Sequence, residues 1–382
     1  MADYGSNTDR RAFLKSVGAG LGLGVIDGRD LQQVGDIEYD PSKEVAYIAG
    51  WENVEGGKPG EREPFYNKIG REDFERRWST FDVKEQIDEK LSQYDEASVA
   101  FEQMEDSPTG FGVAVYMPEL GSTENDREEI EKLVPAETGG GFKFENDRFE
   151  RSRVPVKVET QNRKLTSCSS TNFDYIPGGA SLEVPSKQNE TGTLAAAFYS
   201  NEYGGGWVTA GHVVKDIGGS VGNEIHQDAG EVTDPFGVAR QAHFDLADLD
   251  YAFIEPTSSE STSGFITGSD GSTKEYGLRG IVSDAELVNN VGNESFELLG
   301  HGRTTCQSSG YITGVQGSGT TSVTTTTGVQ PGDSGGPLFK VEDGEAYIAG
   351  IRFMDVDDGA RSKSTTANTV ENKLNGFFAG NS

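Results

Sequence analysis

The sequence predicts an all-β domain over residues 172–382, preceded by a small α+β domain over residues 36–160. From residue 172 onward, short runs rich in β-branched and aromatic residues alternate with turn signals, a pattern typical of an all-β barrel or sandwich. The preceding part mixes strand runs with helical spacing of its apolar residues. The length of 382 residues also favours two domains over one.

The α+β part is predicted to hold three strands and two helices. Its strand runs are 45–49, 112–116 and 154–158. Asp82 and Glu85 form a capping box that predicts the start of a helix, and Val83, Ile87 and Leu91 form its buried stripe. A second helix is expected over 122–134, ending before Pro135. The polar stretch 161–171 has no apolar period and is predicted to be a linker and a site of processing.

The all-β part contains eight strand runs and one closing helix. The strands are expected at 193–199, 207–209, 251–254, 280–282, 296–299, 311–313, 320–327 and 346–351. Residues 363–374 are expected to form the helix. The acidic stretch 355–359 lacks the twelve-residue pattern of a calcium loop, so an exposed hairpin tip is favoured over a cation site.

Glycines crowd both sides of Ser334 in the stretch 330–339, which ends in an apolar strand run. Such a loop can expose a hydroxyl and direct backbone N–H groups toward one point, as acyl transfer requires. A tight turn before a strand would contain the same residue types. The stretch also fits the nucleophile elbow of α/β-hydrolases, in which the histidine follows the serine. That alternative fails, because His212, His226, His243 and His301 all precede Ser334.

A histidine and an aspartate stand in suitable local sequences before the serine. His212 follows the apolar run 206–210, at a junction between strand and turn. Asp250 heads the strand 250–254, on the same face as Ala252 and Ile254. Asp245 and Asp248 are nearby alternatives for the acid, and Asp250 is preferred because it heads the strand.

Three segments resemble chymotrypsin-family serine peptidases: Thr209–His212, Asp250–Ala252 and Gly332–Pro337. The similarity is closest to the bacterial branch of α-lytic protease and the streptogrisins, because the sequence Gly-Arg-Thr-Thr at 302–305 resembles a signature of that branch. Residues 176–179 also resemble the first strand of the mature enzymes, with Pro177 as a departure. The resemblance covers about residues 172–382. The position of the 36–160 domain resembles that of the pro-region of these enzymes, without a motif match, and a separate recognition or anchoring domain is the alternative.

The resemblance implies two antiparallel β-barrels that meet at a catalytic triad. Ser334 would be the nucleophile, His212 the general base and Asp250 the acid that orients it. The backbone N–H groups of Gly332 and Ser334 would form the oxyanion hole. The resemblance implies neither a metal nor an organic cofactor. It implies a serine endopeptidase that acts on proteins or peptides, and a monomer is expected. A binding or adhesion protein that keeps the barrels without catalysis is the alternative.

The resemblance also implies a buried ion pair between Arg303 and Asp333, which would set the oxyanion loop without cleavage of the chain. In the same family, the wall of the primary specificity pocket would come from residues 352–355 and its base from near Gly328. These residues depart from the small wall residues of the family, so the substrate side chain stays unassigned. Arg352 could favour an acidic substrate residue, but in so acidic a chain it is expected to pair with a surface carboxylate.

The net charge of −30 arises from 63 acidic and 33 basic residues spread along the chain. Spread acidity keeps a protein hydrated, while self-repulsion weakens the compact state unless salt screens it. The composition resembles that of halophilic archaeal proteins, although an ordinary acidic secreted protein is the alternative. Nucleic acid and anionic membrane surfaces are poor partners for such a chain.

Residues 1–30 are similar to a twin-arginine export signal, with Arg10 and Arg11 before a glycine-rich apolar run. This run is too short for stable membrane insertion, and no Ala-x-Ala cleavage site follows. Export by this route to the outside of the cell or its surface is favoured over a disordered basic N-terminus. Cys168 and Cys306 would then form one disulfide or remain two buried thiols.

Overall fold

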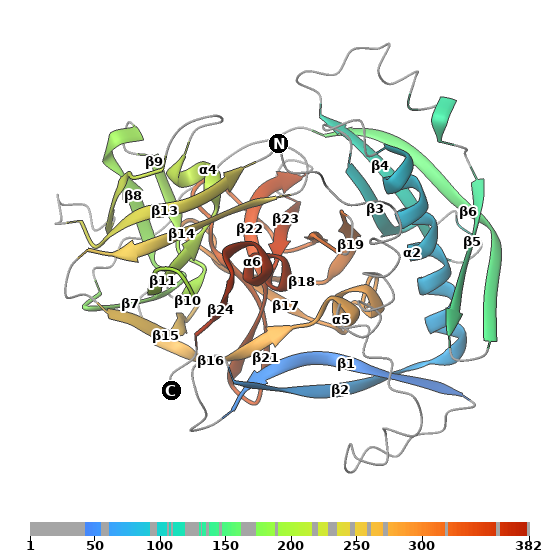
Figure 1. Ribbon diagram of the computed structural model, residues 1–382, viewed down its shortest axis with the longest axis horizontal. Coiled ribbons are helices and arrows are strands. Elements are labelled where there is room, and N and C mark those ends of the chain that lie inside the picture. The colour runs from blue at the N-terminus through green and yellow to red at the C-terminus, as the bar shows by residue number, and fades with distance from the viewer. Residues whose placement is uncertain are drawn as a thin grey trace.

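The computed structural model describes residues 43–379 with internal gaps, the longest at 119–129 and 162–172. Within these residues the chain forms two curled β-sheets, and in Figure 1 the first lies on the left while most of the second lies in the centre and on the right. The first sheet holds eight antiparallel strands from residues 181–256 and from the C-terminus. In spatial order they are β24 (Gly376–Phe378), β10 (Ala196–Ser200), β11 (Gly204–Thr209), β14 (Asp250–Pro256), β13 (Gly237–Phe244), β12 (Glu224–Gln227), β8 (Ser181–Val184) and β9 (Glu190–Thr193).

The second sheet is built mainly from residues 261–366. Its strands are β15 (Ser261–Thr267), β16 (Lys274–Val282), β17 (Leu298–Gly302), β18 (Cys306–Gly310), β19 (Ile312–Gln316), β20 (Ser322–Thr325), β21 (Pro337–Glu342), β22 (Glu345–Val356) and β23 (Arg361–Thr366). Most neighbours are antiparallel, but β16 pairs with β22 in parallel, as β7 (Tyr175–Gly178) does with β15. The predicted all-β architecture of this part is confirmed.

The N-terminal segment, defined here as residues 43–161, extends the second sheet. It contains β1 (Glu44–Asn53), β2 (Arg62–Gly70), α2 (Arg71–Leu91), β3 (Ser98–Gln103), β4 (Phe111–Pro118), β5 (Glu137–Phe144) and β6 (Asp147–Gln161). β1 pairs with β16, and β3 pairs with β19. Figure 1 shows β1 and β2 along the lower edge and α2 beside β3 to β6. The segment is therefore continuous with the all-β part through hydrogen-bonded strands.

One hydrophobic core is shared by the N-terminal segment and the second sheet. Its buried members from the segment are Val45, Phe74, Trp78, Phe101 and Phe111, and those from the second sheet and its helix include Val282, Leu287, Val291, Val315 and Val323. Burial of one such side chain stabilises a fold by roughly 1.5–3 kcal/mol. Polar contacts reinforce the boundary, because Trp78 Nε1 donates to Asn289 Oδ1 at 3.1 Å. The shared core explains why the segment packs as part of this half of the molecule.

The helices differ from the predicted ones at their N-terminal ends. α2 begins at Arg71, eleven residues before the predicted cap at Asp82, because Phe74, Trp78 and Phe81 continue the apolar spacing toward the shared core. The predicted stripe of Val83, Ile87 and Leu91 is buried. The closing helix α6 spans Ala367–Leu374, because residues 361–366 instead form β23 between β20 and β22.

Several predicted features lie outside the described residues. These are the export signal, most of the helix at 122–134, residues 162–171 of the linker, and residues 357–359 of the acidic tip. Asp355, which begins that acidic stretch, lies near the end of β22. In the part of the chain that the structure describes, no helix is long and apolar enough to cross a bilayer.

A buried carboxyl at the boundary predicts a pH dependence of stability. Asp284 begins α5 (Asp284–Asn289), where burial raises its pKa to about 8 despite the nearby Lys84 of α2. The unfolded chain would titrate near pH 3.9. Because the folded state holds this proton more tightly, the stabilising contribution is full below about pH 4 and is lost as the pH rises to about 8.

Replacement of Asp284 by Asn should therefore raise the free energy of unfolding more at pH 9 than at pH 5. Urea unfolding at both pH values measures the difference. The exposed Glu294→Gln serves as a control that removes a carboxyl from the neighbouring loop. An Asp284→Asn effect of equal size at the two pH values would contradict the assignment.

Candidate active site

His212 lies in the short helix α4 (Gly211–Val214), directly after β11. The turn requires glycine at 211, since a Cβ there would lie 2.0 Å from the carbonyl oxygen of His243. The His212 side chain is 9% exposed and lies against the ring of Phe244, with 5.4 Å between ring centroids. The sequence therefore places this imidazole at the end of a rigid strand, as predicted.

Asp250 begins β14 and is fully buried. Its Oδ2 lies 2.5 Å from His212 Nδ1, and its Oδ1 accepts the His212 backbone N–H at 3.0 Å. A carboxylate at Nδ1 favours the tautomer that carries its hydrogen there. His212 Nε2 is then the basic atom, and it is buried without a hydrogen-bond partner among the described residues. The competing acids Asp245 and Asp248 lie outside the described residues.

A threonine of the second sheet holds Asp250 in place. The Thr365 hydroxyl, on β23, accepts from the Asp250 N–H and donates to the Asp250 carbonyl, both at 3.0 Å. Thr365 is fully buried. These two bonds join the strand that carries the acid to the other sheet. Nothing in the local sequence of Thr365 distinguishes this threonine from its neighbours, so sequence reasoning missed it.

Ser334 lies in the loop between β20 and β21, with its residue 6% exposed. Gly332 and Gly335, on either side of it, have φ of 97° and 92°. Lack of space also excludes a side chain at position 335, because its Cβ would lie 2.0 Å from Thr209 Oγ1. The glycines around Ser334 thus permit a backbone path that passes directly against the first sheet.

The backbone donors of this loop divide into two groups. The N–H groups of Asp333, Gly335 and Gly336 donate to carbonyl oxygens of Gln330, Arg352 and Asp333. Within the described residues, the N–H groups of Gly332 and Ser334 donate to no partner. The two N–H groups predicted for the oxyanion hole are therefore the two that the loop leaves available.

Asp333 is fully buried, and its carboxylate is anchored by the Gly-Arg-Thr-Thr stretch. Oδ1 accepts the N–H groups of Thr304 and Thr305 at 2.8 and 3.2 Å, while Oδ2 accepts the Thr305 hydroxyl at 2.7 Å and the Gln330 N–H at 3.0 Å. Gly302 makes this approach possible, because a Cβ there would lie 2.2 Å from Asp333 Oδ1.

The cation beside Asp333 differs from the predicted one. Arg352 Nη1 lies 4.0 Å from Asp333 Oδ2, whereas Arg303 Nη1 donates to Thr191 Oγ1 at 3.1 Å. The backbone of Arg303 adjoins the site and donates to Thr193 Oγ1. The predicted Arg303–Asp333 pair is corrected accordingly, because the turn at 302–305 presents its N–H groups and the Thr305 hydroxyl to the carboxylate.

Arg352 was also predicted to lie at the surface, which was wrong. Its side chain is fully buried, and Nη2 donates to the Gly328 carbonyl oxygen. Burial lowers the pKa of this guanidinium, and the charge of Asp333 opposes that shift. The available sequence signal was an arginine inside the apolar run 348–354. In an acidic chain that signal is outweighed by the many exposed carboxylates with which an arginine can pair.

The structure does not test whether Cys168 and Cys306 form a disulfide or remain two thiols. Cys168 lies outside the described part of the chain, so both alternatives stay open. Cys306 begins β18 with φ of 51° and is partly buried. Among the described residues, no group of three or more His, Cys, Asp or Glu side chains is arranged to hold a metal ion.

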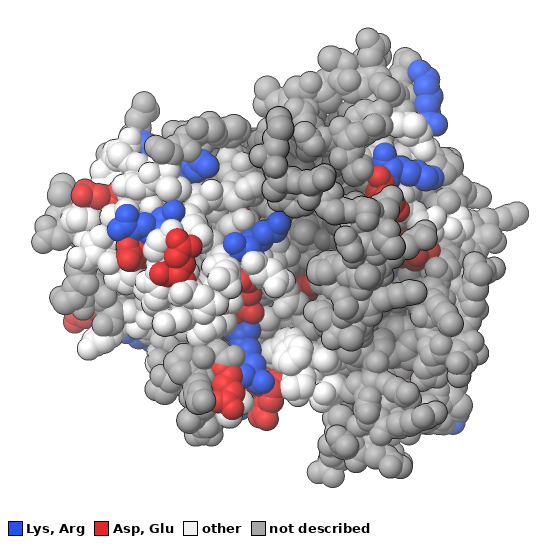
Figure 2. All heavy atoms as spheres, in the orientation of Figure 1, with Lys and Arg blue, Asp and Glu red and all other residues white. Residues whose placement is uncertain are grey.

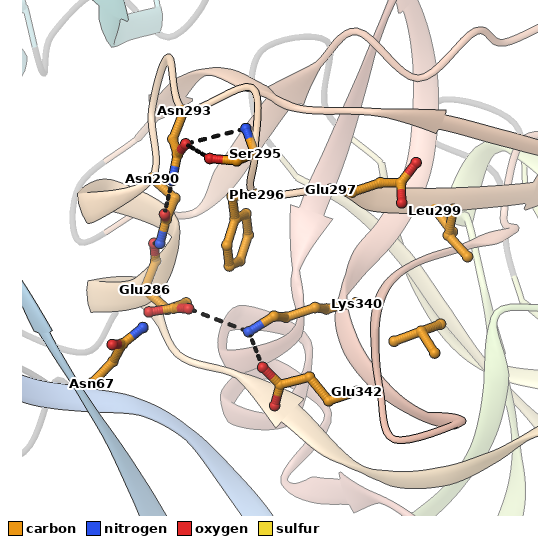
Figure 3. A pocket seen from close by; sticks show the side chains of 11 residues that line it. Asn67, Glu286, Asn290, Asn293, Ser295, Phe296, Glu297, Leu299, Lys340 and Glu342 are labelled. Atoms are coloured by element: carbon orange, nitrogen blue, oxygen red, sulfur yellow. Dashed lines mark hydrogen bonds and ion pairs between the residues drawn. The ribbon is translucent and has the colours of Figure 1, made fainter. Parts of the chain in front are cut away.

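A separate hollow of about 390 Å³ lies between the N-terminal segment and the second sheet (Figure 3). Asn67 of β2 faces Glu286 of α5, and Lys340 of β21 lies 3.5 Å from the Glu286 carboxylate. Burial raises the pKa of Glu286, whose other oxygen accepts the Tyr47 hydroxyl at 2.7 Å. None of the predicted site residues lines this hollow, and its groups connect the N-terminal segment to the second sheet.

Comparison with known proteins identifies the part of the chain that carries the site. Residues 195–349 match a family model described as a trypsin-like peptidase domain. This stretch is therefore similar to trypsin-like peptidase domains, and the fold of this part of the chain is chymotrypsin-like. No curated protein matches the chain. The matched stretch contains His212, Asp250 and Ser334, while the N-terminal segment lies before it.

Solved structures of proteases are similar over about half of this chain. A chymotrypsin of Cellulomonas bogoriensis is 18% identical, with a TM-score of 0.37, and the match covers 54% of this chain and 99% of that one. A Nocardiopsis protease is 19% identical, with a TM-score of 0.39, and the match covers 53% of this chain and 98% of that one. A glutamic acid specific serine protease is 18% identical, with a TM-score of 0.40, and the match covers 53% of this chain and 100% of that one.

The two arginines near the serine loop should respond differently to substitution. Arg352→Met removes the cation nearest the buried Asp333 carboxylate, and loss of one member of a buried pair costs up to about 3–5 kcal/mol. We expect this variant to lose more thermal stability, and more of its reaction rate with a fluorophosphonate probe, than Arg303→Met. A larger loss of stability and reaction rate in Arg303→Met would favour the predicted Arg303–Asp333 pair and contradict the Arg352–Asp333 pair.

Proposed function

We propose that the protein is a secreted serine endopeptidase that cleaves peptide bonds through Ser334, His212 and Asp250. The observation that carries the proposal is the 2.5 Å contact between His212 Nδ1 and Asp250 Oδ2, which leaves Nε2 as a buried base with no hydrogen-bond partner among the described residues. Ser334 stands on a glycine-rich loop in the same matched domain. This combination suits acyl transfer from a peptide carbonyl.

In the proposed reaction, the Ser334 hydroxyl attacks the substrate carbonyl while His212 Nε2 accepts its proton. The tetrahedral intermediate collapses when His212 returns that proton to the leaving amine, which leaves an acyl-enzyme. Water then attacks the ester with His212 again as base, and Ser334 is released with the acid product. Asp250 keeps the imidazole oriented and stabilises its charged form throughout.

The oxyanion of each tetrahedral intermediate is assigned to the N–H groups of Gly332 and Ser334. Donors already aimed at the developing charge lower the barrier without reorganisation, and one such donor is worth roughly 10²–10³ in rate. The assignment is supported by the absence of any other acceptor for these two groups among the described residues. Protein and peptide substrates are expected, and their side-chain preference stays open.

The triad assignment predicts strongly non-additive losses. Ser334→Ala and His212→Ala should each reduce kcat/KM for peptide cleavage by roughly 10⁴–10⁶-fold, and the double variant should be hardly worse, because the triad acts as one unit. Peptide hydrolysis and fluorophosphonate labelling of Ser334 measure this. Multiplying losses would reject the triad, and a native protein that neither reacts with the probe nor cleaves peptides would support the binding-protein alternative.

We further propose export through the twin-arginine route and membership of the bacterial α-lytic protease and streptogrisin branch. The motif at Arg10 and Arg11 supports the route. The contacts of Thr304 and Thr305 with Asp333 support the branch, since they give its signature a function beside the serine.

We propose a halophilic protein from the net charge of −30. On the face that Figure 2 shows, described acidic and basic side chains occur together in small groups. Arg240 and Glu255 form a partly exposed ion pair. The excess of acidic residues over the whole chain therefore remains as self-repulsion for salt to screen.

Raising salt should stabilise the protein and increase its activity. The screening length falls from about 10 Å at 0.1 M to about 3 Å at 1 M salt, which weakens repulsion between separated carboxylates. The melting temperature and peptide hydrolysis should both rise from 0.1 M into the molar range. A melting temperature that is flat over this range would reject the halophilic proposal and leave the peptidase proposal intact.

A further inference from the structure

Thr193, the last residue of β9, contacts the serine loop from the first sheet. Its residue is fully buried. The Thr193 N–H donates to the Ser334 carbonyl at 2.9 Å, and the Thr193 hydroxyl donates to the Gly332 carbonyl at 2.6 Å. These are the carbonyl groups of the two residues whose N–H groups are proposed to bind the oxyanion.

The same threonine is itself held by two other elements. Its hydroxyl accepts the Arg303 N–H at 3.0 Å, and its carbonyl accepts the Thr209 hydroxyl at 2.7 Å. A hydroxyl can donate once while it accepts, so one side chain joins the Gly-Arg-Thr-Thr turn to the serine loop. The β-branched side chain has few χ1 rotamers, which suits a contact that must stay in one geometry.

The serine loop needs such a contact because its glycines make it conformationally permissive. Gly332 and Gly335 both have positive φ, and glycine reaches many other backbone conformations at little cost. Rotation around Gly332 would turn its N–H away from the substrate carbonyl. The N–H and the carbonyl of Gly332 lie in the two peptide units on either side of its Cα, so a hydrogen bond to the carbonyl fixes the following unit and limits rotation about the residue. The bond to the Ser334 carbonyl fixes the unit that follows the serine in the same way.

We propose that Thr193 is a positioning residue that sets the N–H groups of Gly332 and Ser334 for oxyanion binding before substrate arrives. The inference rests on the proposed peptidase function. It adds a residue of the first sheet to the groups that position the serine loop, which belongs to the second sheet. Thr193 contacts neither substrate nor the reacting atoms. Its hydroxyl acts through the Gly332 carbonyl. The contact stabilises the transition state, where negative charge develops on the substrate oxygen, more than it stabilises the bound substrate.

The test compares Thr193→Val, which keeps the shape and the backbone N–H but removes the hydroxyl, with Thr193→Ser, which keeps the hydroxyl. Thr191→Val is the matched control, because this threonine lies two residues earlier on β9 and its hydroxyl accepts from the Arg303 side chain instead. Each protein is measured for kcat and KM on one peptide substrate, for its pH profile, and for inhibition by a peptide boronic acid that mimics the tetrahedral intermediate.

Thr193→Val should lower kcat by at least tenfold, toward the 10²–10³ that loss of one oxyanion donor produces, with KM changed less than about twofold. Affinity for the boronic acid should fall in parallel with kcat/KM. The midpoints of the pH profile should stay in place, because no charged group is removed. Thr193→Ser should retain most activity, as should Thr191→Val.

Equal kcat values in Thr193→Val and Thr191→Val would overturn the proposal. So would a Thr193→Val loss that the melting temperature explains, with normal kcat per folded molecule counted by active-site labelling. If the native protein reacts with the fluorophosphonate probe, these outcomes reject the Thr193 role alone. If the native protein does not react, the proposed function is rejected and the role of Thr193 with it.

Discussion

The buried carboxylate of Asp333 determines how the serine loop is built. A carboxylate away from water must be surrounded by donors, and here four hydrogen bonds come from Thr304, Thr305 and Gln330. Arg352 forms backbone hydrogen bonds with Gly335 and Gly336, and the Arg352 guanidinium lies near the same carboxylate. Since Ser334 is the next residue in the chain, satisfying this one charge also fixes the position of the serine.

Hydroxyl groups join the two sheets around the site. Thr193 connects the first sheet to the carbonyls of Gly332 and Ser334, and Thr365 connects the second sheet to Asp250. Thr365 is paired with Ile351 in the neighbouring strand, directly before Arg352. A continuous path of backbone and hydroxyl hydrogen bonds therefore runs from the acid to the serine loop, and neither sheet alone holds the complete site.

Sequence reasoning selected the residues whose chemistry depends on local pattern, and the structure brings two of them, His212 and Asp250, into contact. His212, Asp250 and Ser334 stand in short segments whose glycines and strand alternation are visible in the sequence, and the order of the four histidines excluded the elbow alternative. The roles of Thr193 and Thr365 depend on partners 139 and 115 residues away, and many other threonines share their local context. Arg303 and Arg352 show the same limit, because the sequence shows a cation near the motif but not which side chain the turn directs inward. The pairing of β1 with β16 was invisible for the same reason.

The strand pairings of the N-terminal segment impose an order on folding. Gly50 pairs with Val282, and Phe101 pairs with Val315, so the second sheet is completed by contacts more than 200 residues apart in sequence. Contacts of such separation form slowly, because much of the chain must be confined before they stabilise it. During synthesis β1 and β3 are made before β16 and β19, the distant strands with which they pair. Until those strands are made, the unpaired edges of β1 and β3 are exposed to aggregation. The serine loop comes after β1 to β20 in the chain, so hydrolytic competence arises only once all of these strands have been made.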